Sequence, residues 1–196
     1  CNGDTNMFII TVKPVPVLTK TADITVCSGD SVNVPAFVSS PSSVISWTNS
    51  NTSIGLPASG TGTISSYVSS NLSGVSQTGT IIVSSSLNGC SAISDTFTIT
   101  IHPKPLVQSI HNNINVCSGQ TIPAVNFIAN PSTSVVNWYS TSASIVSSGT
   151  GNIASQVYVN TGMVNVLDTV YYYPSNAGCN GDTNMFIITV KPVPVL

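Results

Sequence analysis

Cysteine is the residue type whose spacing in this 196-residue sequence indicates the clearest chemistry. The five cysteines are Cys1, Cys27, Cys90, Cys117 and Cys179, and the last four fall into two similar segments. Four cysteines allow three pairings. Confinement of each bond to one segment predicts Cys27–Cys90 and Cys117–Cys179, with Cys1 bonded to a cysteine of a preceding segment. Loops of 63 and 62 residues (90 − 27 and 179 − 117) would each contribute roughly 4 kcal/mol of stability.

A metal site is the rival interpretation of these cysteines. The sequence has no C-x₂-C pair and no histidine near a cysteine, so zinc ligation is not supported. Regular disulfides indicate an oxidising compartment, either the cell surface or the medium. Aspartate provides all of the acidic residues and no D-x-D run occurs, so we expect no calcium site, no other metal and no cofactor.

Catalysis is the next chemistry to consider. His102 and His111 could in principle join Asp23 or Asp95 and a serine in a triad. No G-x-S-x-G elbow occurs, and both histidines lie at or near an expected linker rather than in a cleft. The sequence therefore predicts a protein that is not an enzyme.

Tyrosines form the other chemically suggestive group. Tyr139 and the run Tyr171-Tyr172-Tyr173 could form a platform on which sugar rings stack. On a strand, alternation directs Tyr172 to one face and its neighbours to the other. We therefore expect cross-strand packing rather than ligand binding.

The elements that must position these residues repeat at two scales. Residues 1–18 recur unchanged as residues 179–196, an offset of 178 residues, so the parent chain repeats with this period. Within the period, Val26-Cys27-Ser28-Gly29 is matched by Val116-Cys117-Ser118-Gly119. The period therefore holds two related modules of about 90 residues, the size of one β-sandwich.

Alternating proline marks the module boundaries, at Pro14 and Pro16, Pro103 and Pro105, and Pro192 and Pro194. Such motifs favour stiff, extended connectors. The expected domains are the last strand of a preceding module (1–12), a first β-sandwich (13–102), a second β-sandwich (103–190) and a linker (191–196).

Short alternating strands fill both modules. We expect strands over 32–38, 44–47, 64–68 and 80–83 in the first module, with a hairpin turn at Asn88-Gly89. The second module has expected strands over 122–128, 135–139, 153–159 and 170–173, with a turn at 176–178. The expected core anchors are Trp47, Trp138, Phe97 and Phe186. The fold class is all-β, with tandem Ig-like or PKD-like sandwiches joined by short proline-rich linkers.

Composition restricts the partners. Only 5% of the residues are charged and the net charge is −2, which excludes a basic surface for nucleic acid. No apolar run approaches the roughly 20 residues that span a bilayer. An apolar, almost uncharged surface predicts association with copies of the same chain or a glycan coat.

The motifs VCSGD, SWTNSNTSIGLPASGTG and TFTITI in the first module resemble the PKD-like repeats of giant bacterial surface proteins exported by type IX secretion. The second module, with VCSGQ and VYYYPSNAGC, resembles an Ig-like module of gliding-motility proteins. The resemblance implies β-sandwich spacers in adhesins and secreted enzymes. It also implies O-glycosylation at Asp-Ser/Thr-aliphatic motifs, which makes Ser31 and Thr169 candidates and Thr96 a weaker one.

The favoured hypothesis is a structural, self-associating repeat of an extracellular bacterial filament or surface fibre. Two alternatives stay open: a spacer stalk of a giant cell-surface adhesin, and a carbohydrate-binding accessory module of a secreted enzyme. Surface glycans are additional candidate partners.

Overall fold

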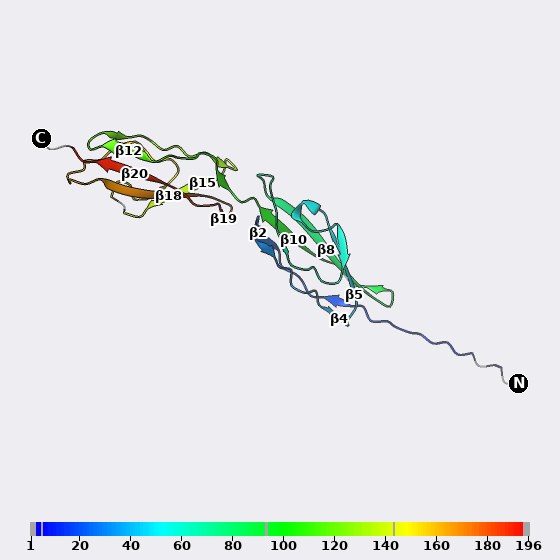
Figure 1. The fold of residues 1–196 in the computed structure, drawn as a ribbon. Coiled ribbons are helices and arrows are strands. Elements are labelled where there is room, and N and C mark those ends of the chain that lie inside the picture. The colour runs from blue at the N-terminus through cyan, green and yellow to red at the C-terminus, as the bar shows by residue number, and fades with distance from the viewer. Residues whose placement is uncertain (1–2, 5, 93, 143, 194–196) are drawn as a thin grey trace. The chain divides into compact units, whose positions relative to one another are not determined.

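A computed structural model describes residues 3–4, 6–92, 94–142 and 144–193. The chain forms two compact units (Figure 1). Unit 1 comprises residues 1–26, 30–69 and 77–101, and unit 2 comprises residues 27–29, 70–76 and 102–196. Nearly every element is a strand, and the one helix in the described part of the chain is a single 3₁₀ turn, η1 (Thr52–Ile54). The predicted all-β class is confirmed.

Unit 1 is built on a main sheet with the strand order β2-β10-β8-β5-β6, and β9 pairs with the end of β8. Two short pairs, β1-β4 and β3-β7, lie across the core from this sheet, because Val32 and Leu18 pack against its buried side chains. The strands are β1 (Val17–Leu18), β2 (Ile24–Cys27), β3 (Ser31–Val32), β4 (Ser39–Ser40), β5 (Val44–Asn49), β6 (Ser59–Thr61), β7 (Tyr67–Val68), β8 (Gln77–Leu87), β9 (Cys90–Ser91) and β10 (Asp95–His102).

Unit 2 repeats this topology. Its main sheet has the order β12-β20-β18-β15-β16 with β19 on the end of β18, and β11-β14 and β13-β17 are the short pairs. The strands are β11 (Leu106–Val107), β12 (Ile114–Cys117), β13 (Thr121–Ile122), β14 (Ala129–Asn130), β15 (Val135–Ser140), β16 (Ser148–Thr150), β17 (Gln156–Val157), β18 (Val166–Asn176), β19 (Cys179–Asn180) and β20 (Asn184–Lys191).

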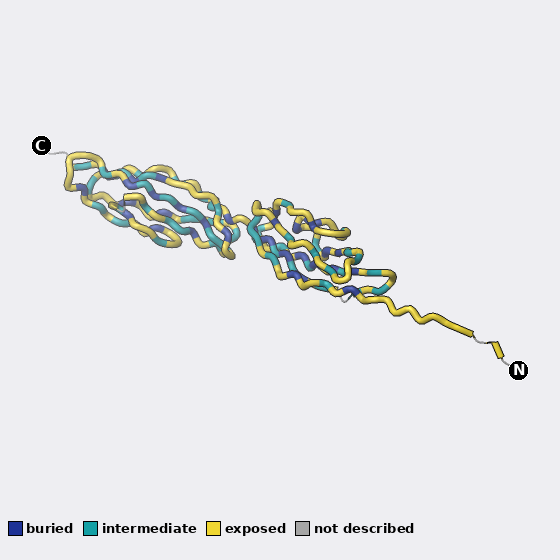
Figure 2. Tube along the Cα trace, turned by 90° about the horizontal axis from the view of Figure 1, so that it is seen from below, coloured by how far each residue is buried: buried dark blue, intermediate teal, exposed yellow. Residues whose placement is uncertain are grey.

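Alternating sequence produces these sandwiches, because successive side chains of a strand point to opposite faces. In β8, Ile81 and Val83 are buried whereas Ile82 between them is exposed. In β10, Phe97, Ile99 and Ile101 are buried in the same way. Figure 2 shows this alternation as buried and exposed residues following one another along the strands. Each unit therefore has its own core.

The predicted strands over 32–38 and 122–128 are each broken in the structure. Pro35 and Pro123 fall inside these runs, and proline has no N–H to continue a ladder. The first run accordingly gives β3 and leads into β4, and the second gives β13 and leads into β14. The long strands β8 and β18 extend well beyond their predicted limits, while the hairpin turns after them lie where expected.

The sequence Asn-Met-Phe-Ile-Ile-Thr-Val-Lys occurs at residues 6–13 and again at 184–191. At 184–191 it forms β20, with Phe186, Ile188 and Val190 buried. At 6–13 it forms no strand and is exposed along its length (Figure 2). The predicted identity of residues 1–12, the last strand of a preceding module, stays a prediction, as do the limits of the other three domains.

Candidate functional site: the cysteine-bearing turns

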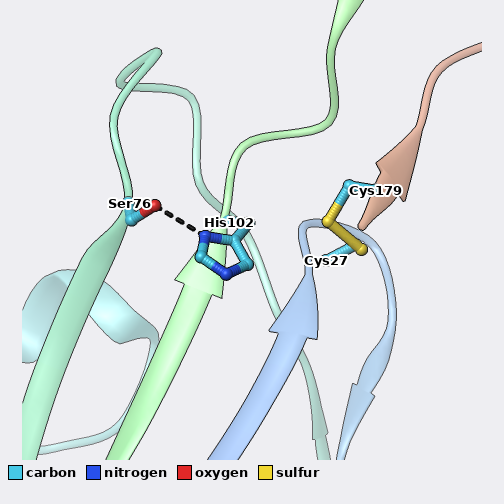
Figure 3. The surroundings of a disulfide bond; sticks show 4 residues. All are labelled: Cys27, Ser76, His102 and Cys179. Atoms are coloured by element: carbon cyan, nitrogen blue, oxygen red, sulfur yellow. Dashed lines mark hydrogen bonds between the residues drawn. A yellow bond between two sulfur atoms is a disulfide. The ribbon is translucent and has the colours of Figure 1, made fainter. Parts of the chain in front are cut away.

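One disulfide joins Cys27, at the end of β2, to Cys179, at the start of β19 (Figure 3). The two Cα atoms are 5.6 Å apart, an ordinary separation for a bonded pair. Cys90 and Cys117 are free thiols in the described part of the chain. The predicted pairings Cys27–Cys90 and Cys117–Cys179 are therefore wrong. Cys1 lies outside the described residues.

The direction of the strands explains why Cys27 and Cys90 are not bonded to each other. Cys27 lies beside the end of β10, because the N–H of Ser28 donates to the carbonyl of His102 at 2.8 Å. Cys90 lies beyond the start of β10, because it pairs with Leu87 at the end of antiparallel β8. The length of β10, roughly 23 Å over its residues 95–102, separates these ends. A disulfide requires Cα atoms within about 7 Å, so the two cysteines of one sandwich cannot bond.

Strand pairing in unit 2 likewise separates Cys117 from Cys179. Strand β12 is parallel to β20, and Cys117 is in register with Lys191, the last residue of β20. Cys179 precedes the first residue of β20 by five positions (184 − 179). The first and last strands of the main sheet, β12 and β20, pair in parallel, which equal spacing of cysteines cannot reveal, and this pairing places Cys117 and Cys179 at opposite ends of the sheet.

A small polar network holds the turn that carries Cys27. Gly29 has a φ of +100°, a conformation that favours glycine. The hydroxyl of Ser28 accepts a hydrogen bond from the N–H of Asn71 at 2.8 Å, and the Asn71 side chain donates to the carbonyl of Val75 at 2.8 Å. Beside this turn, Ser76 and Nδ1 of His102 are 2.6 Å apart (Figure 3). The Cys-Ser-Gly turn is thus tied to a neighbouring loop as well as to the disulfide.

The turn that carries Cys179 is a tight hairpin. Ala177 and Gly178 both have positive φ angles, 49° and 81°, which matches the two-residue turn typical of twisted hairpins. Asn176 is in register with Cys179, whose side chain is 1% exposed. Cys179 is therefore buried directly after a tight two-residue turn.

The histidines and aspartates considered for catalysis serve local structure instead. Asp23 accepts a hydrogen bond from the N–H of Thr98 at 2.7 Å, and this bond holds the pKa of Asp23 below its ordinary value. Asp95 accepts from the N–H of Thr21 at 2.7 Å. His102 bonds to Ser76 as described, and the structure brings neither histidine to either aspartate.

His111 lies in an aromatic cluster on unit 2. Its ring is 5.0 Å from that of Phe127, 5.8 Å from that of Tyr172 and 6.0 Å from that of Phe186, measured between centroids. Burial lowers the pKa of His111. The cluster is thus part of the core, in which Phe186 is 1% exposed.

The tyrosine run divides between the two faces of its sheet. Tyr172 is buried in the core, and Tyr171 stacks on Tyr139 of the neighbouring strand, with centroids 5.4 Å apart and planes 16° apart. The expected alternation is confirmed. The Tyr139–Tyr171 pair lies on the outer face, with Tyr139 exposed.

The two tryptophans occupy matching places over a glycine. Trp47 and Trp138 face Gly60 and Gly149 on the adjacent strands, where an added Cβ would lie 2.2 Å and 2.5 Å from the indole rings. Trp47 is buried with Phe97, whereas Trp138 is half-buried and packs against the core of unit 2. Both indole N–H groups are buried without a hydrogen-bond partner among the described residues.

The glycosylation candidates differ in their accessibility. Ser31 and Thr96 are exposed on β3 and β10, whereas Thr169 is half-buried. Asp168, which precedes Thr169, is fully buried and accepts hydrogen bonds from the hydroxyls of Ser140 and Ser142 and from the N–H groups of Ile145 and Val146. The Asp168-Thr169 motif therefore has a structural role, and its aspartate is not accessible. Glycosylation of the other two candidates stays a prediction.

The Asp-Thr-Val motif in the sequence does not by itself reveal the structural role of Asp168. A single acidic residue in an otherwise uncharged alternating strand was the available signal. Among the described residues, no three His, Cys, Asp or Glu side chains gather as metal ligands. No helix in the described part of the chain has the length and apolar character to cross a membrane.

Comparison with known proteins gives matches of structure only. No protein-family model and no curated protein matches the sequence. A three-Ig-domain structure of titin aligns with a TM-score of 0.51 and 12% identity, covering 90% of this chain and 65% of that one. The immunoglobulin domains 1–4 of Sidekick-1 align with a TM-score of 0.51 and 14% identity, covering 90% and 48%. A two-Ig structure of DIP-gamma gives 0.45 and 9%, covering 92% and 99%. By its fold, this chain is a tandem of Ig-like β-sandwich domains.

Proposed function

We propose that this chain is a repeating segment of an extracellular bacterial filament or surface fibre, exported by the type IX route, whose copies pack against one another. The role is structural and non-catalytic. A disulfide and an Ig-like fold are typical of extracellular domains. The 178-residue period supports a long, repetitive molecule.

The observation that carries the proposal is the outer face of unit 2. This face consists of outward side chains of three adjacent strands: Asn137, Tyr139, Leu167, Thr169, Tyr171, Tyr173, Met185, Ile187 and Thr189. Leu167 and Met185 are both 56% exposed. The one charged side chain within these strands away from their ends, Asp168, points inward and is fully buried.

A soluble monomer usually keeps a sheet face such as this polar and interspersed with charge. Here Tyr139, Tyr171 and Met185 stand side by side across the three strands, in register with one another. Aromatic and methionine side chains are enriched where protein surfaces meet. We therefore propose that a second copy of the chain covers this face, because a periodic polymer presents many copies of the same surface at high local concentration.

Sedimentation and light scattering of the chain over a range of concentrations test this proposal. We expect reversible association that Leu167→Lys or Tyr171→Lys weakens by tenfold or more. The matched control is Thr161→Lys, which adds the same charge on an exposed loop of the same unit and should leave association unchanged. Electron microscopy of the multi-period protein should then show laterally packed fibres.

Two outcomes would replace the proposal. A chain that stays monomeric at every concentration, and isolated threads in the microscope, would indicate a spacer stalk of an adhesin. Binding to a polysaccharide that Tyr171→Lys abolishes would instead indicate a carbohydrate-binding module.

A further inference from the structure

Cys117 occupies the same structural position as Cys27. The N–H of Ser118 donates to the carbonyl of Lys191 at 2.8 Å, as the N–H of Ser28 does to His102. The hydroxyl of Ser118 accepts from the N–H of Asn160 at 2.8 Å, as that of Ser28 does from Asn71. Gly119 has a φ of +79°. The turn is the same, yet the thiol of Cys117 is exposed and unpaired.

Cys90 likewise occupies the position of Cys179. Its turn, Asn88-Gly89, has φ angles of 50° and 85°, which closely match those of the Cys179 turn. Cys90 is in register with Leu87, as Cys179 is with Asn176. In both hairpins the strand is also closed two residues later, by the N–H of Ala92 on the carbonyl of Ser85 and by that of Gly181 on Pro174. Each free cysteine thus has a bonded counterpart of the same geometry.

The 178-residue period places these free cysteines in the same order as the bonded pair. The observed disulfide runs from a Cys-Ser-Gly turn to a hairpin cysteine 152 residues later. From Cys117 to the counterpart of Cys90 in the next period the separation is 151 residues (90 + 178 − 117). The two spacings agree to one residue.

We infer that Cys117 is bonded to the counterpart of Cys90 in the following period, and Cys90 to the counterpart of Cys117 in the preceding one. Each Cys-Ser-Gly turn of the parent chain is then bonded to a hairpin cysteine of the module that follows it, as Cys27 is to Cys179. The inference rests on the disulfide and the repeat, and it is independent of lateral association between chains.

Bond formation here is a two-electron oxidation. The two thiols lose two protons and two electrons and form one S–S bond, while an oxidised disulfide, either a small molecule or an exchange protein, is reduced to two thiols. Cys117 is an exposed residue, so such a disulfide can approach it. The bond then forms through a mixed-disulfide intermediate.

Free thiols in a two-period chain test the inference. Residues 1–196 followed by a second copy of 19–196 carry nine cysteines, namely Cys1 and four in each period. The chain is folded with oxidised and reduced glutathione, denatured, alkylated and weighed. We expect three alkylated thiols: Cys1, Cys90 of the first period and Cys117 of the second. Bonds confined to single modules would leave Cys1 alone.

Two matched variants make the test decisive. Cys90→Ser in the second period removes the partner of Cys117 in the first, so the number of free thiols should rise from three to four. Cys90→Ser in the first period removes a free thiol, so the number should fall to two. Both variants carry the same substitution at the same structural position, and a folding defect would affect them alike. Equal thiol counts in the two variants would overturn the inference.

Discussion

Asp168 shows how one residue can organise a loop. Its carboxylate accepts four hydrogen bonds, two from hydroxyls and two from backbone N–H groups, while the side chain is fully buried in β18. Burial raises the pKa of Asp168, but the bonds from Ser140, Ser142, Val146 and Ile145 together lower it further, so the pKa lies below its ordinary value of 3.8. The ionised form is therefore the one that the fold stabilises.

We expect Asp168→Asn to lower the free energy of unfolding of unit 2 at pH 7 by about 1–3 kcal/mol, because hydrogen bonds to a buried charge are lost. Since the folded pKa is depressed, this contribution is present above the unfolded pKa and disappears as the pH falls through the folded pKa. The difference between wild type and variant should therefore shrink in acid. Urea unfolding from pH 7 to pH 3 measures it. Asp182→Asn is the control, because the Asp182 side chain is 84% exposed in its ion pair with Lys104. A difference that stays constant with pH would contradict the role assigned to the charge.

At the scale of elements, the same loop is held in two different ways. In unit 1 the position of Asp168 is taken by Gly79, where an added Cβ would lie 2.6 Å from the side-chain oxygen of Asn49. Asn49 is buried, donates to the carbonyls of Leu56 and Asn51, and accepts from the N–H of Asn51. The polar group thus comes from β5 in unit 1 and from β18 in unit 2. In both cases it satisfies the backbone of the segment after the central strand.

The identical stretches 6–13 and 184–191 allow the effect of burial to be tested with the same substitution in the same local sequence. Phe8 and Phe186 lie in identical eight-residue stretches, and they are 82% and 1% exposed. Phe186→Ala should cost about 3–5 kcal/mol, because a buried aromatic ring is removed from the core. Phe8→Ala should change stability by less than about 0.5 kcal/mol. Thermal and urea unfolding of the two variants measure this. Equal losses would mean that residues 6–13 are also packed in a core.

Alternation of apolar residues was sufficient to predict the fold class, the strands β5, β8, β15 and β18 and the burial of Phe97 and Phe186, because strand formation depends on local pattern and burial. The disulfide could not be predicted in the same way. Spacing of Cys27 and Cys90 within one repeat says nothing about strand direction, and the bonded partner of Cys27 is 152 residues away. The role of Asp168 also depended on Ser140 and Ser142, which belong to a different strand and its following loop.

At the scale of the whole molecule, the disulfides determine which parts of the chain can be extended by force. When a protein is pulled from its ends, the load follows the shortest covalent path through the backbone and the disulfide bonds, and residues off that path are not extended. With the bonding pattern inferred above, this path enters at Cys27, crosses to Cys179 and follows the backbone to the counterpart of Cys27 in the next period. That stretch has 26 residues (27 + 178 − 179).

Bonds confined to single modules would leave a longer path. The stretch between Cys90 and Cys117 would add 27 residues (117 − 90), for 53 residues in each period. At 3.3–3.6 Å per residue, the extended lengths per period are roughly 90 Å for the inferred pattern and roughly 180 Å for the alternative. Full reduction should release all 178 residues of the period, roughly 600 Å. Single-molecule pulling of a chain of several periods, before and after a reductant is added, measures these lengths. An oxidised extension near the longer value would show that the modules are closed individually, whereas the shorter value would show that the Cys27–Cys179 bond of each period keeps most of that period from bearing load.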